Sequence, residues 1–308
     1  MSLSLLMLSL WDGIKRVSNS TIADSLDDQP LTTHASQFLG VGAFPYERLP
    51  THSKVVAYLL QPSNVLLCIG LYLLSEKPVQ GLRRLLFGNA NNHNKNNQNQ
   101  KPTVPQWFTN LVALHNFGLC LFSLWIAVLS WYRVLSHYQR HGWFETYCDP
   151  NDTLWIDANF GTLCTMFYLS KYYEFVDTWI LVLKGKPASF LQTYHHAGIV
   201  LCMYGGVTSH SSWLLFVVLL NSVIHTVMYW YFCVKTLFPH VQIKSAKYLT
   251  MAQIGQFLIG IVGTAGILVM GNDCDSQSSR LFLWGLQLYG YGLIALFVTF
   301  ANRKYKQS

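Results

Sequence analysis

The sequence predicts an all-α, polytopic membrane protein with seven transmembrane helices. Of its 308 residues, 51% are hydrophobic and only 11% are charged, against about 25% charged residues in an ordinary soluble domain. Mean hydropathy is +0.26. A helix needs roughly 20 mostly apolar residues to cross a bilayer, and seven stretches of the chain approach or meet this requirement. The predicted spans are residues 55–74, 108–132, 158–183, 190–207, 213–234, 249–270 and 281–300.

The spans differ in regularity. The first is interrupted by Pro62, the third carries charges, and the fourth is short and polar around His195. The other four are apolar runs, and none of the seven shows the alternation of a transmembrane β-strand. This composition excludes a disordered chain, a coiled coil and most soluble enzymes. The chain also lacks the basic runs interleaved with aromatic residues that bind nucleic acid.

The distribution of Lys and Arg predicts how the spans are oriented. The connecting segments fall into two alternating sets, of which the first holds 13 basic and one acidic residue and the second holds 7 basic and 11 acidic residues. The positive-inside rule places the first set in the cytosol. That set comprises residues 75–107, 184–189, 235–248 and 301–308, and the lumenal set comprises residues 1–54, 133–157, 208–212 and 271–280.

Features of these segments agree with that orientation. Glycosylation sequons at Asn19 and Asn151 both fall on the lumenal side. Lys304 and Lys306 resemble a dilysine retrieval signal of the endoplasmic reticulum on a cytosolic tail, residues 301–308. We therefore expect a lumenal segment 1–54 without a signal peptide, a membrane domain 55–300 and a disordered, Asn-rich cytosolic loop 89–101.

Three formal charges lie inside the predicted spans, all in the third. They belong to Lys171, Glu174 and Asp177, and Thr178 follows them. A charge in hydrocarbon costs about 2.5–3.5 kcal/mol even on the lenient insertion scale, so the cluster indicates a site facing the interior of the protein. The alternative is a Lys–Glu pair three residues apart that only neutralises itself near the membrane edge.

Neighbouring spans add polar side chains at helical spacing. The fourth begins with Gln192, His195 and His196; the fifth carries Asn221, His225 and Tyr229; the sixth carries Gln253 and Gln256. Asn and Gln side chains in membrane helices often do no more than hydrogen-bond to neighbouring helices. Polar faces on several helices of one chain, however, favour an enclosed cavity that these helices share. These side chains suit nucleophilic and acid–base chemistry. We predict no metal, because membrane oxygenases need several histidine boxes, whereas His115, His195, His196 and His225 are the only histidines within the predicted spans.

The four motifs together resemble those of the ELO family of very-long-chain fatty-acid elongases. They read Lys171-x-x-Glu174-x-x-Asp177-Thr178, Gln192-x-x-His195-His196, Asn221-x-x-x-His225-x-x-Met228-Tyr229 and Thr250-x-x-Gln253-x-x-Gln256-Phe257. The resemblance implies six helices in a ring around an acyl-chain tunnel, with a seventh outside. It also implies condensation of acyl-CoA with malonyl-CoA to a 3-oxoacyl-CoA, CO2 and CoA, the first step of two-carbon elongation in the endoplasmic reticulum membrane.

By the same resemblance, His195 would be acylated and His196 and His225 would act as bases or orienting partners. Asp177, Asn221 and Gln192 would fix histidine tautomers. Lys171, Glu174, Asn221, Tyr229, Gln253 and Gln256 would contact substrate. From their place on segments predicted to be cytosolic, we expect Lys184, Lys186, Lys244 and Lys247 to hold CoA phosphates or only to anchor the helices. The resemblance implies no bound cofactor. Its partners are the two CoA substrates, the lipid bilayer and the reductase, dehydratase and enoyl reductase of the cycle; we also consider a homodimer.

Two positions depart from the family pattern. Gln192 replaces the first His of HxxHH, a form that resembles the elongases of polyunsaturated fatty acids in microalgae and other lower eukaryotes. Phe232 replaces the last Tyr of MYxYY, so we give it no polar role. A seven-span receptor or small transporter, and a His-dependent membrane desaturase or hydroxylase, are the alternative functions.

The cysteines predict one disulfide. Five of the seven Cys lie within spans, whereas Cys148 and Cys274 lie on segments predicted to be lumenal, where the compartment is oxidising. We therefore expect a Cys148–Cys274 bond at the lumenal end of the tunnel. Position alone suggests that Tyr204, Trp213 and Met270 lie near the same end.

Overall fold

The computed structural model describes residues 54–88, 104–241 and 246–305, and within these ranges every regular element is a helix. The predicted all-α class is thus confirmed. In chain order the elements are α3 (Lys54–Leu59), α4 (Pro62–Leu74), α5 (Glu76–Phe87), α6 (Gln106–Cys148), η4 (Thr153–Asp157), α7 (Phe160–Tyr173), α8 (Phe175–Leu183), α9 (Phe190–Thr208), α10 (Leu214–Leu237), α11 (Ala246–Met270), η5 (Gly271–Asp273) and α12 (Gln277–Tyr305).

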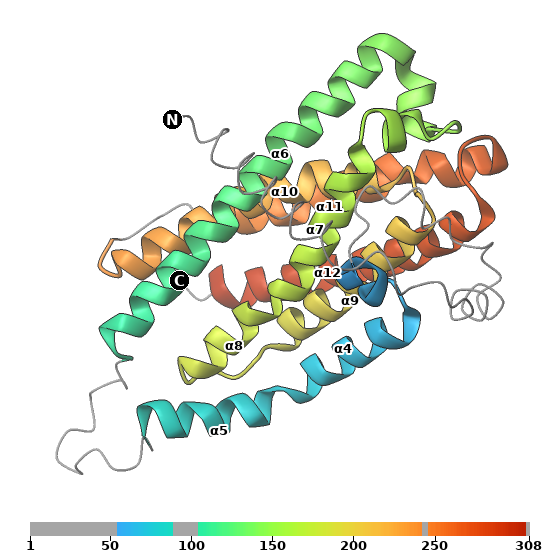
Figure 1. The fold of residues 1–308 in the computed structure, drawn as a ribbon. Coiled ribbons are helices and arrows are strands. Elements are labelled where there is room, and N and C mark those ends of the chain that lie inside the picture. Colours follow the sequence, from blue (N-terminus) through green and yellow to red (C-terminus); the bar gives the residue numbers. More distant parts are fainter. Residues whose placement is uncertain (1–53, 89–103, 242–245, 306–308) are drawn as a thin grey trace, which may run out of the picture.

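Six helices pack in a closed circuit (Figure 1). Helix α6 packs against α10, α10 against α11, and α11 against α12; α12 packs against α9, α9 against α7, and α7 returns to α6. Helices α4 and α5 lie outside this circuit, against α9 and α8 respectively. The circuit agrees with the expected ring of six helices with one further hydrophobic segment outside it.

Several helices have the length and hydropathy of membrane spans. Among the described residues these are α6, α10, α11 continued through η5, and α12. A fifth candidate is the pair α4 and α5, which is bent by 51°. The chain is therefore a multi-pass membrane protein, while the count of seven spans stays a prediction.

The first predicted span is broken where the proline predicts a break. Pro62 occupies the first turn of α4, and Gln61 before it is extended. Proline lacks an N–H and its ring clashes with the carbonyl four residues earlier, so it is tolerated at a helix start but not in a helix interior. The hydrophobic run 55–74 therefore becomes two helices, α3 and α4, and α5 continues into a segment that the sequence analysis treated as a loop.

Two other boundaries also differ from prediction. The third span, 158–183, is divided at Glu174 into α7 and α8. Helix α6 runs to Cys148, beyond the predicted end at residue 132, because its polar continuation still has helical backbone except at Gly142, where φ is +82°. Hydrophobicity marks where a helix leaves hydrocarbon, not where its backbone hydrogen bonds end.

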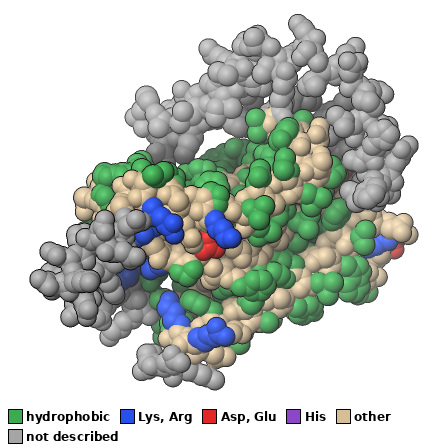
Figure 2. All heavy atoms as spheres, turned by 90° about the horizontal axis from the view of Figure 1, so that it is seen from below, with side chains coloured by type: hydrophobic (Ala, Val, Ile, Leu, Met, Phe, Trp, Pro, Cys, Tyr) green, Lys and Arg blue, Asp and Glu red, His purple; other side chains and the backbone are tan. Residues whose placement is uncertain are grey.

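The described parts of the two predicted sets of connecting segments lie at opposite ends of the bundle. Figure 1 shows α5, α8 and α12 ending at the left, whereas α6 ends and η5 lies at the right. Figure 2 shows hydrophobic side chains over much of one face, with most of the visible Lys and Arg side chains gathered toward one end. Many large apolar side chains on the outer helix faces are exposed, among them Val262, Val269 and Leu288, as expected for helices that face lipid.

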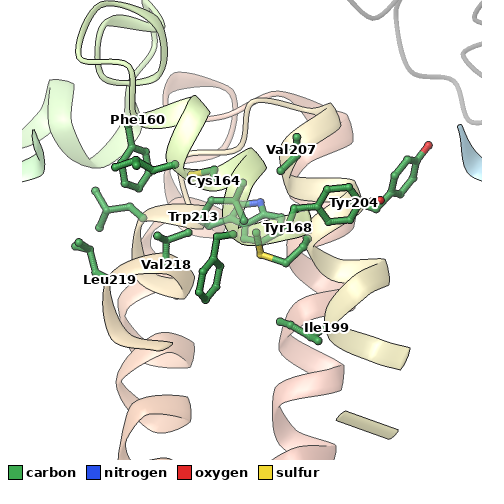
Figure 3. Close-up of a cluster of buried hydrophobic side chains, with 14 of the residues drawn as sticks. Phe160, Cys164, Tyr168, Ile199, Tyr204, Val207, Trp213, Val218 and Leu219 are labelled. Carbon is green, nitrogen blue, oxygen red and sulfur yellow. The ribbon is translucent and has the colours of Figure 1, made fainter. Parts of the chain in front are cut away.

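Large apolar side chains fill the interior toward the C-terminal end of α9. Tyr168 from α7, Tyr204 and Val207 from α9, and Trp213 at the start of α10 are buried together (Figure 3). The Trp213 indole donates to Ser279 Oγ on α12 at 3.0 Å. Tyr204 and Trp213 thus lie where their sequence positions suggested, and Met270 ends α11 and is packed against this core cluster.

A disulfide joins Cys148 at the end of α6 to Cys274 after η5, with Cα atoms 4.5 Å apart. This is the predicted pair. It links elements separated by 126 residues in the sequence, and it lies at the same end of the bundle as the cluster around Trp213. Of the two sequons, Asn151 is exposed in the turn after α6. Asn19, the Asn-rich loop 89–101, Lys244 and Lys306 lie outside the described residues, as does nearly all of the segment 1–54.

Candidate active site

His195 and His196 lie in the second turn of α9. The helix begins after Ser189, whose hydroxyl accepts a hydrogen bond from the Gln192 backbone N–H at 3.2 Å. Because adjacent helical residues point in directions about 100° apart, the two imidazoles enter different surroundings. His195 faces a cavity, whereas His196 is buried with its ring edge-on to Tyr72 and Phe175.

The His195 side chain is held by Tyr289 on α12. The Tyr289 hydroxyl lies 2.9 Å from His195 Nδ1 and donates to the His195 backbone carbonyl, also at 2.9 Å. The His225 ring centre is 6.5 Å from that of His195, and the His196 ring centre is 5.5 Å away. The three predicted catalytic histidines thus come together.

The buried charges of the third predicted span lie beside them. Lys171 Nζ, which is fully buried, donates to Glu174 Oε1 at 2.7 Å and to Asn221 Oδ1 at 3.3 Å. His225 Nδ1 lies 3.6 Å from the same Glu174 oxygen. The Glu174 carboxylate therefore binds the ammonium and lies near an imidazole that is beyond hydrogen-bond distance. The Lys–Glu pair is thus part of the histidine cluster and not an isolated pair at the membrane edge.

Asp177 has different partners from those predicted. Its Oδ1 lies 2.7 Å from His115 Nε2, and its Oδ2 accepts from the Tyr229 hydroxyl at 2.6 Å. Asp177 lies in the first turn of α8, three residues beyond Glu174, so the break between α7 and α8 directs it toward α6 and α10. The expected direct contact with His195, His196 or His225 is wrong; Asp177 orients His115 and Tyr229.

A narrow cavity runs between α9, α10, α11 and α12. Its volume is about 70 Å³. The lining is largely apolar, and its polar side chains are His195, Asn221, Gln256, Thr264, Gln287 and Tyr289. The lining is therefore a mostly apolar surface with a few polar side chains, one of them His195, which is the composition typical of a ligand site.

Comparison with known proteins places this arrangement in a family. The family model of the ELO (GNS1/SUR4) family matches residues 57–308. The chain belongs to this family. It is 35% identical over 200 residues to long chain fatty acid elongase 2 of Caenorhabditis elegans, covering 64% of this chain and 72% of that protein.

Two further relatives carry the same kind of name. Fatty acid elongase sre1 of Dictyostelium discoideum is 36% identical over 166 residues, 53% of this chain and 59% of its own length. Fatty acid elongase 2 of Trypanosoma cruzi is 30% identical over 154 residues, covering 50% and 55%. This ELO-family chain is therefore an enzyme of fatty-acid elongation, and the receptor, transporter and desaturase alternatives have no support.

The three glutamine side chains that the motifs of this ELO-family protein contain have different surroundings. Gln256 lines the cavity, and its buried Oε1 has no hydrogen-bond partner among the described residues. Gln253 points its amide at Met228 Sδ, 3.5 Å away. The Gln192 side chain makes no hydrogen bond within the described part of the chain, so its predicted role in fixing a tautomer has no geometric support here.

Of the predicted CoA-binding lysines, the three that the structure describes lie at the end of the bundle nearest the histidines. Lys184 caps α8 and is half-buried, whereas Lys186 and Lys247 are exposed. Sequence reasoning missed Arg83 on α5. Its guanidinium lies close beside Gly185, where a Cβ would come 3.1 Å from Nη2, and its buried Nε has no partner among the described residues.

Sequence reasoning also missed Tyr289. Tyrosines are common in membrane helices, and nothing in the seventh span marks this one as special. Gln287, two residues earlier, is a buried amide that donates to Thr264. Residues two apart on a helix point in directions about 200° apart, so that amide does not identify Tyr289 from the sequence.

Proposed function

We propose that this protein catalyses the condensation of a long-chain acyl-CoA with malonyl-CoA, giving a 3-oxoacyl-CoA two carbons longer, CO2 and CoA. The observation that carries the proposal is His195 at the wall of an apolar cavity, beside a buried cluster of His225, Glu174 and Lys171. An acyl chain in the cavity would bring its thioester to the imidazole, and the water-poor surroundings would protect an acyl-imidazole from hydrolysis.

In the first half-reaction, His195 attacks the thioester and CoA leaves. In the second, malonyl-CoA loses CO2 and its α-carbon takes the acyl group from His195. Glu174 lies beside His225, and the Lys171 ammonium pairs with its carboxylate in a site where an unpaired charge would be costly. We assign His225 and His196 as the bases or orienting partners of the second step.

The CoA portion would remain at the basic end of the bundle. Lys184, Lys186 and Lys247 would meet its phosphates as point charges, Lys244 would join them, and Arg83 would supply a planar, bidentate donor. Tyr229, Gln253 and Gln256 would contact the acyl portion or its carbonyl. No tightly bound cofactor is needed for this chemistry.

We extend the proposal to the cellular setting. The enzyme works in the endoplasmic reticulum membrane with its N-terminus in the lumen and its C-terminus in the cytosol. It hands its product to the reductase, dehydratase and enoyl reductase that complete the cycle. The Gln192 form of the histidine motif favours polyunsaturated substrates, which a panel of saturated and polyunsaturated acids fed to a heterologous host would test.

The reaction is tested with purified enzyme, labelled malonyl-CoA and a long-chain acyl-CoA. The proposal predicts a labelled 3-oxoacyl-CoA that requires both substrates and is abolished in His195→Ala. His240→Ala is the matched control, because His240 is an exposed loop histidine remote from α9 in the sequence. Full activity of folded His195→Ala, or product formation without malonyl-CoA, would contradict the proposal.

A further inference from the structure

We propose that Tyr289 is a positioning residue that fixes the His195 imidazole in one tautomer, with the proton on Nδ1 and the reactive lone pair on Nε2. The inference deepens the proposed function, because it specifies which nitrogen attacks the thioester. It rests on two hydrogen bonds made by a single hydroxyl and on the packing that holds the Tyr289 ring in place.

The hydrogen bonds determine the direction of each proton. The Tyr289 hydroxyl lies 2.9 Å from the His195 backbone oxygen and 2.9 Å from His195 Nδ1. A carbonyl oxygen can only accept, so the one phenolic proton is directed to it. The hydroxyl then presents a lone pair to Nδ1, and Nδ1 must carry a hydrogen for that contact to be favourable. In a neutral imidazole, Nε2 is consequently unprotonated.

The opposite assignment is unfavourable. If the Tyr289 hydroxyl donated to an unprotonated Nδ1, no proton would remain between the hydroxyl and the His195 carbonyl. Two oxygen lone pairs would then face each other in an interior where unmatched polar groups are costly. The backbone carbonyl is thus the element that decides the tautomer, because it cannot change its role.

The Tyr289 ring has little freedom to move. It is buried against the backbone of Gly198, one helical turn after His195, where an added Cβ would lie 2.3 Å from Tyr289 Cε2. The Tyr194 ring centre is 5.4 Å from that of Tyr289, and the Tyr194 hydroxyl donates to the Tyr289 carbonyl at 3.4 Å. The glycine therefore creates the space from which the hydroxyl reaches back to His195.

This tautomer allows both half-reactions without removing a proton from His195. The Nε2 lone pair forms a bond to the acyl carbon, the C–S bond breaks, and CoA leaves as a thiolate while Nδ1 keeps its proton. Loss of CO2 from malonyl-CoA leaves an electron pair on its α-carbon. That pair forms the new C–C bond as the N–C bond breaks, and neutral His195 is restored with Nδ1 still protonated.

The tautomer is tested directly by the position of alkylation. Full-length wild-type protein, Tyr289→Phe and Tyr291→Phe are treated with a dodecyl bromoacetamide, an apolar electrophile that alkylates an unprotonated nitrogen. The His195 peptide is isolated, and the two alkylhistidine isomers are separated. We expect the Nε2 isomer in wild type and in Tyr291→Phe, whose hydroxyl is on the exposed face of α12. We expect both isomers in Tyr289→Phe.

Alkylation of wild type at Nδ1, or the Nε2 isomer alone in Tyr289→Phe, would overturn the assignment. A purely structural role for Tyr289 would lower the melting temperature without changing the isomer ratio, and this outcome also counts against the proposal. Gly198→Ala is a second variant, because the added methyl group displaces the ring. It is expected to give the same mixture of isomers while leaving the Tyr289 hydroxyl in the protein.

Kinetics separate this inference from the proposed function. With acyl-CoA alone, the burst of CoA release should be about tenfold slower in Tyr289→Phe, as expected for the loss of one hydrogen bond, with KM for acyl-CoA unchanged. An unchanged burst rate would contradict the role of Tyr289. If wild type shows no burst but is alkylated at Nε2, the proposed function fails and the tautomer assignment stands.

Discussion

His115 Nε2 on α6 lies 2.7 Å from Asp177 Oδ1 on α8. The contact joins a helix of the ring to the segment after the break at Glu174, and the other Asp177 oxygen accepts from Tyr229 on α10. Three helices are therefore tied together beside the histidine cluster by one carboxylate. The geometry makes His115 a second partner of a motif residue, although it belongs to none of the four motifs.

Removing His115 should weaken the site through Asp177. In His115→Ala the carboxylate keeps only Tyr229, and we expect a loss of stability of about 1–3 kcal/mol, because a hydrogen bond to a charged, half-buried group is lost. Turnover should fall by about tenfold if the resulting movement of Tyr229 reaches the cavity. Thermal unfolding and the condensation assay measure the two effects, with exposed His240→Ala as control. Wild-type stability and turnover in His115→Ala would contradict this role.

Removing one charge of the Lys171–Glu174 pair should destabilise the protein more than removing both charges. Lys171→Met leaves Glu174 buried without its ammonium partner, and we expect a destabilisation of about 3–5 kcal/mol. The double variant Lys171→Met, Glu174→Gln removes both charges and should recover most of that loss in a thermal unfolding assay, although not the activity. Equal destabilisation in the single and double variants would show that the buried charge is not the cause.

The sequence predicts most of the fold because hydrophobicity marks the membrane spans. Each apolar run that is long enough to cross a bilayer predicts one helix. It predicts helix breaks less well. Pro62 carries a local signal, whereas the division at Glu174 depends on contacts of Lys171 and Asp177 with other helices. The extension of α6 to Cys148 was missed because a polar helix outside hydrocarbon has no hydropathy signal.

In the candidate site, too, the sequence predicts local groupings better than contacts between helices. Helical spacing correctly groups Lys171 with Glu174, and the positions of Cys148 and Cys274 predict their bond. The partners of Asp177 and the approach of Tyr289 to His195 depend on which helices become neighbours in the ring. One sequence without a tertiary arrangement does not determine those neighbours, so the tautomer partners predicted from the motifs alone were partly wrong.

The Cys148–Cys274 bond should stabilise the end of the bundle remote from His195. For a loop of 126 residues the chain-entropy estimate is roughly 4–5 kcal/mol, and a chain already restrained by a membrane should gain less. We expect each single Cys→Ser variant and the double variant to lower the unfolding temperature equally. Mass spectrometry of the unreduced protein should find no free thiol at either position. Additive effects of the two substitutions would mean that the residues contribute separately.

Asp275, in the short segment between η5 and α12, should make stability depend on pH. Burial raises the pKa of its carboxyl from 3.8 to about 6, despite hydrogen bonds from Ser279 and Ser212. Because the folded-state pKa is the higher one, the folded state binds the proton more tightly. The resulting stabilisation is complete below about pH 4 and is lost as pH rises through about 6.

Replacement of Asp275 with Asn removes this titration. The unfolding temperature of Asp275→Asn relative to that of wild type should therefore rise between about pH 4 and pH 7. Asp273→Asn is the control, because Asp273 is exposed. A difference that is constant across this range would show that Asp275 does not titrate there.

The measurement that tests the central claim most directly is the site of acylation. Purified enzyme is incubated with a long-chain acyl-CoA, without malonyl-CoA, and its peptides are analysed by mass spectrometry. The account predicts one acyl group on His195, released as the 3-oxoacyl-CoA when malonyl-CoA is added. An acyl group on another residue, or condensation at full rate with no acyl-enzyme formed, would contradict it.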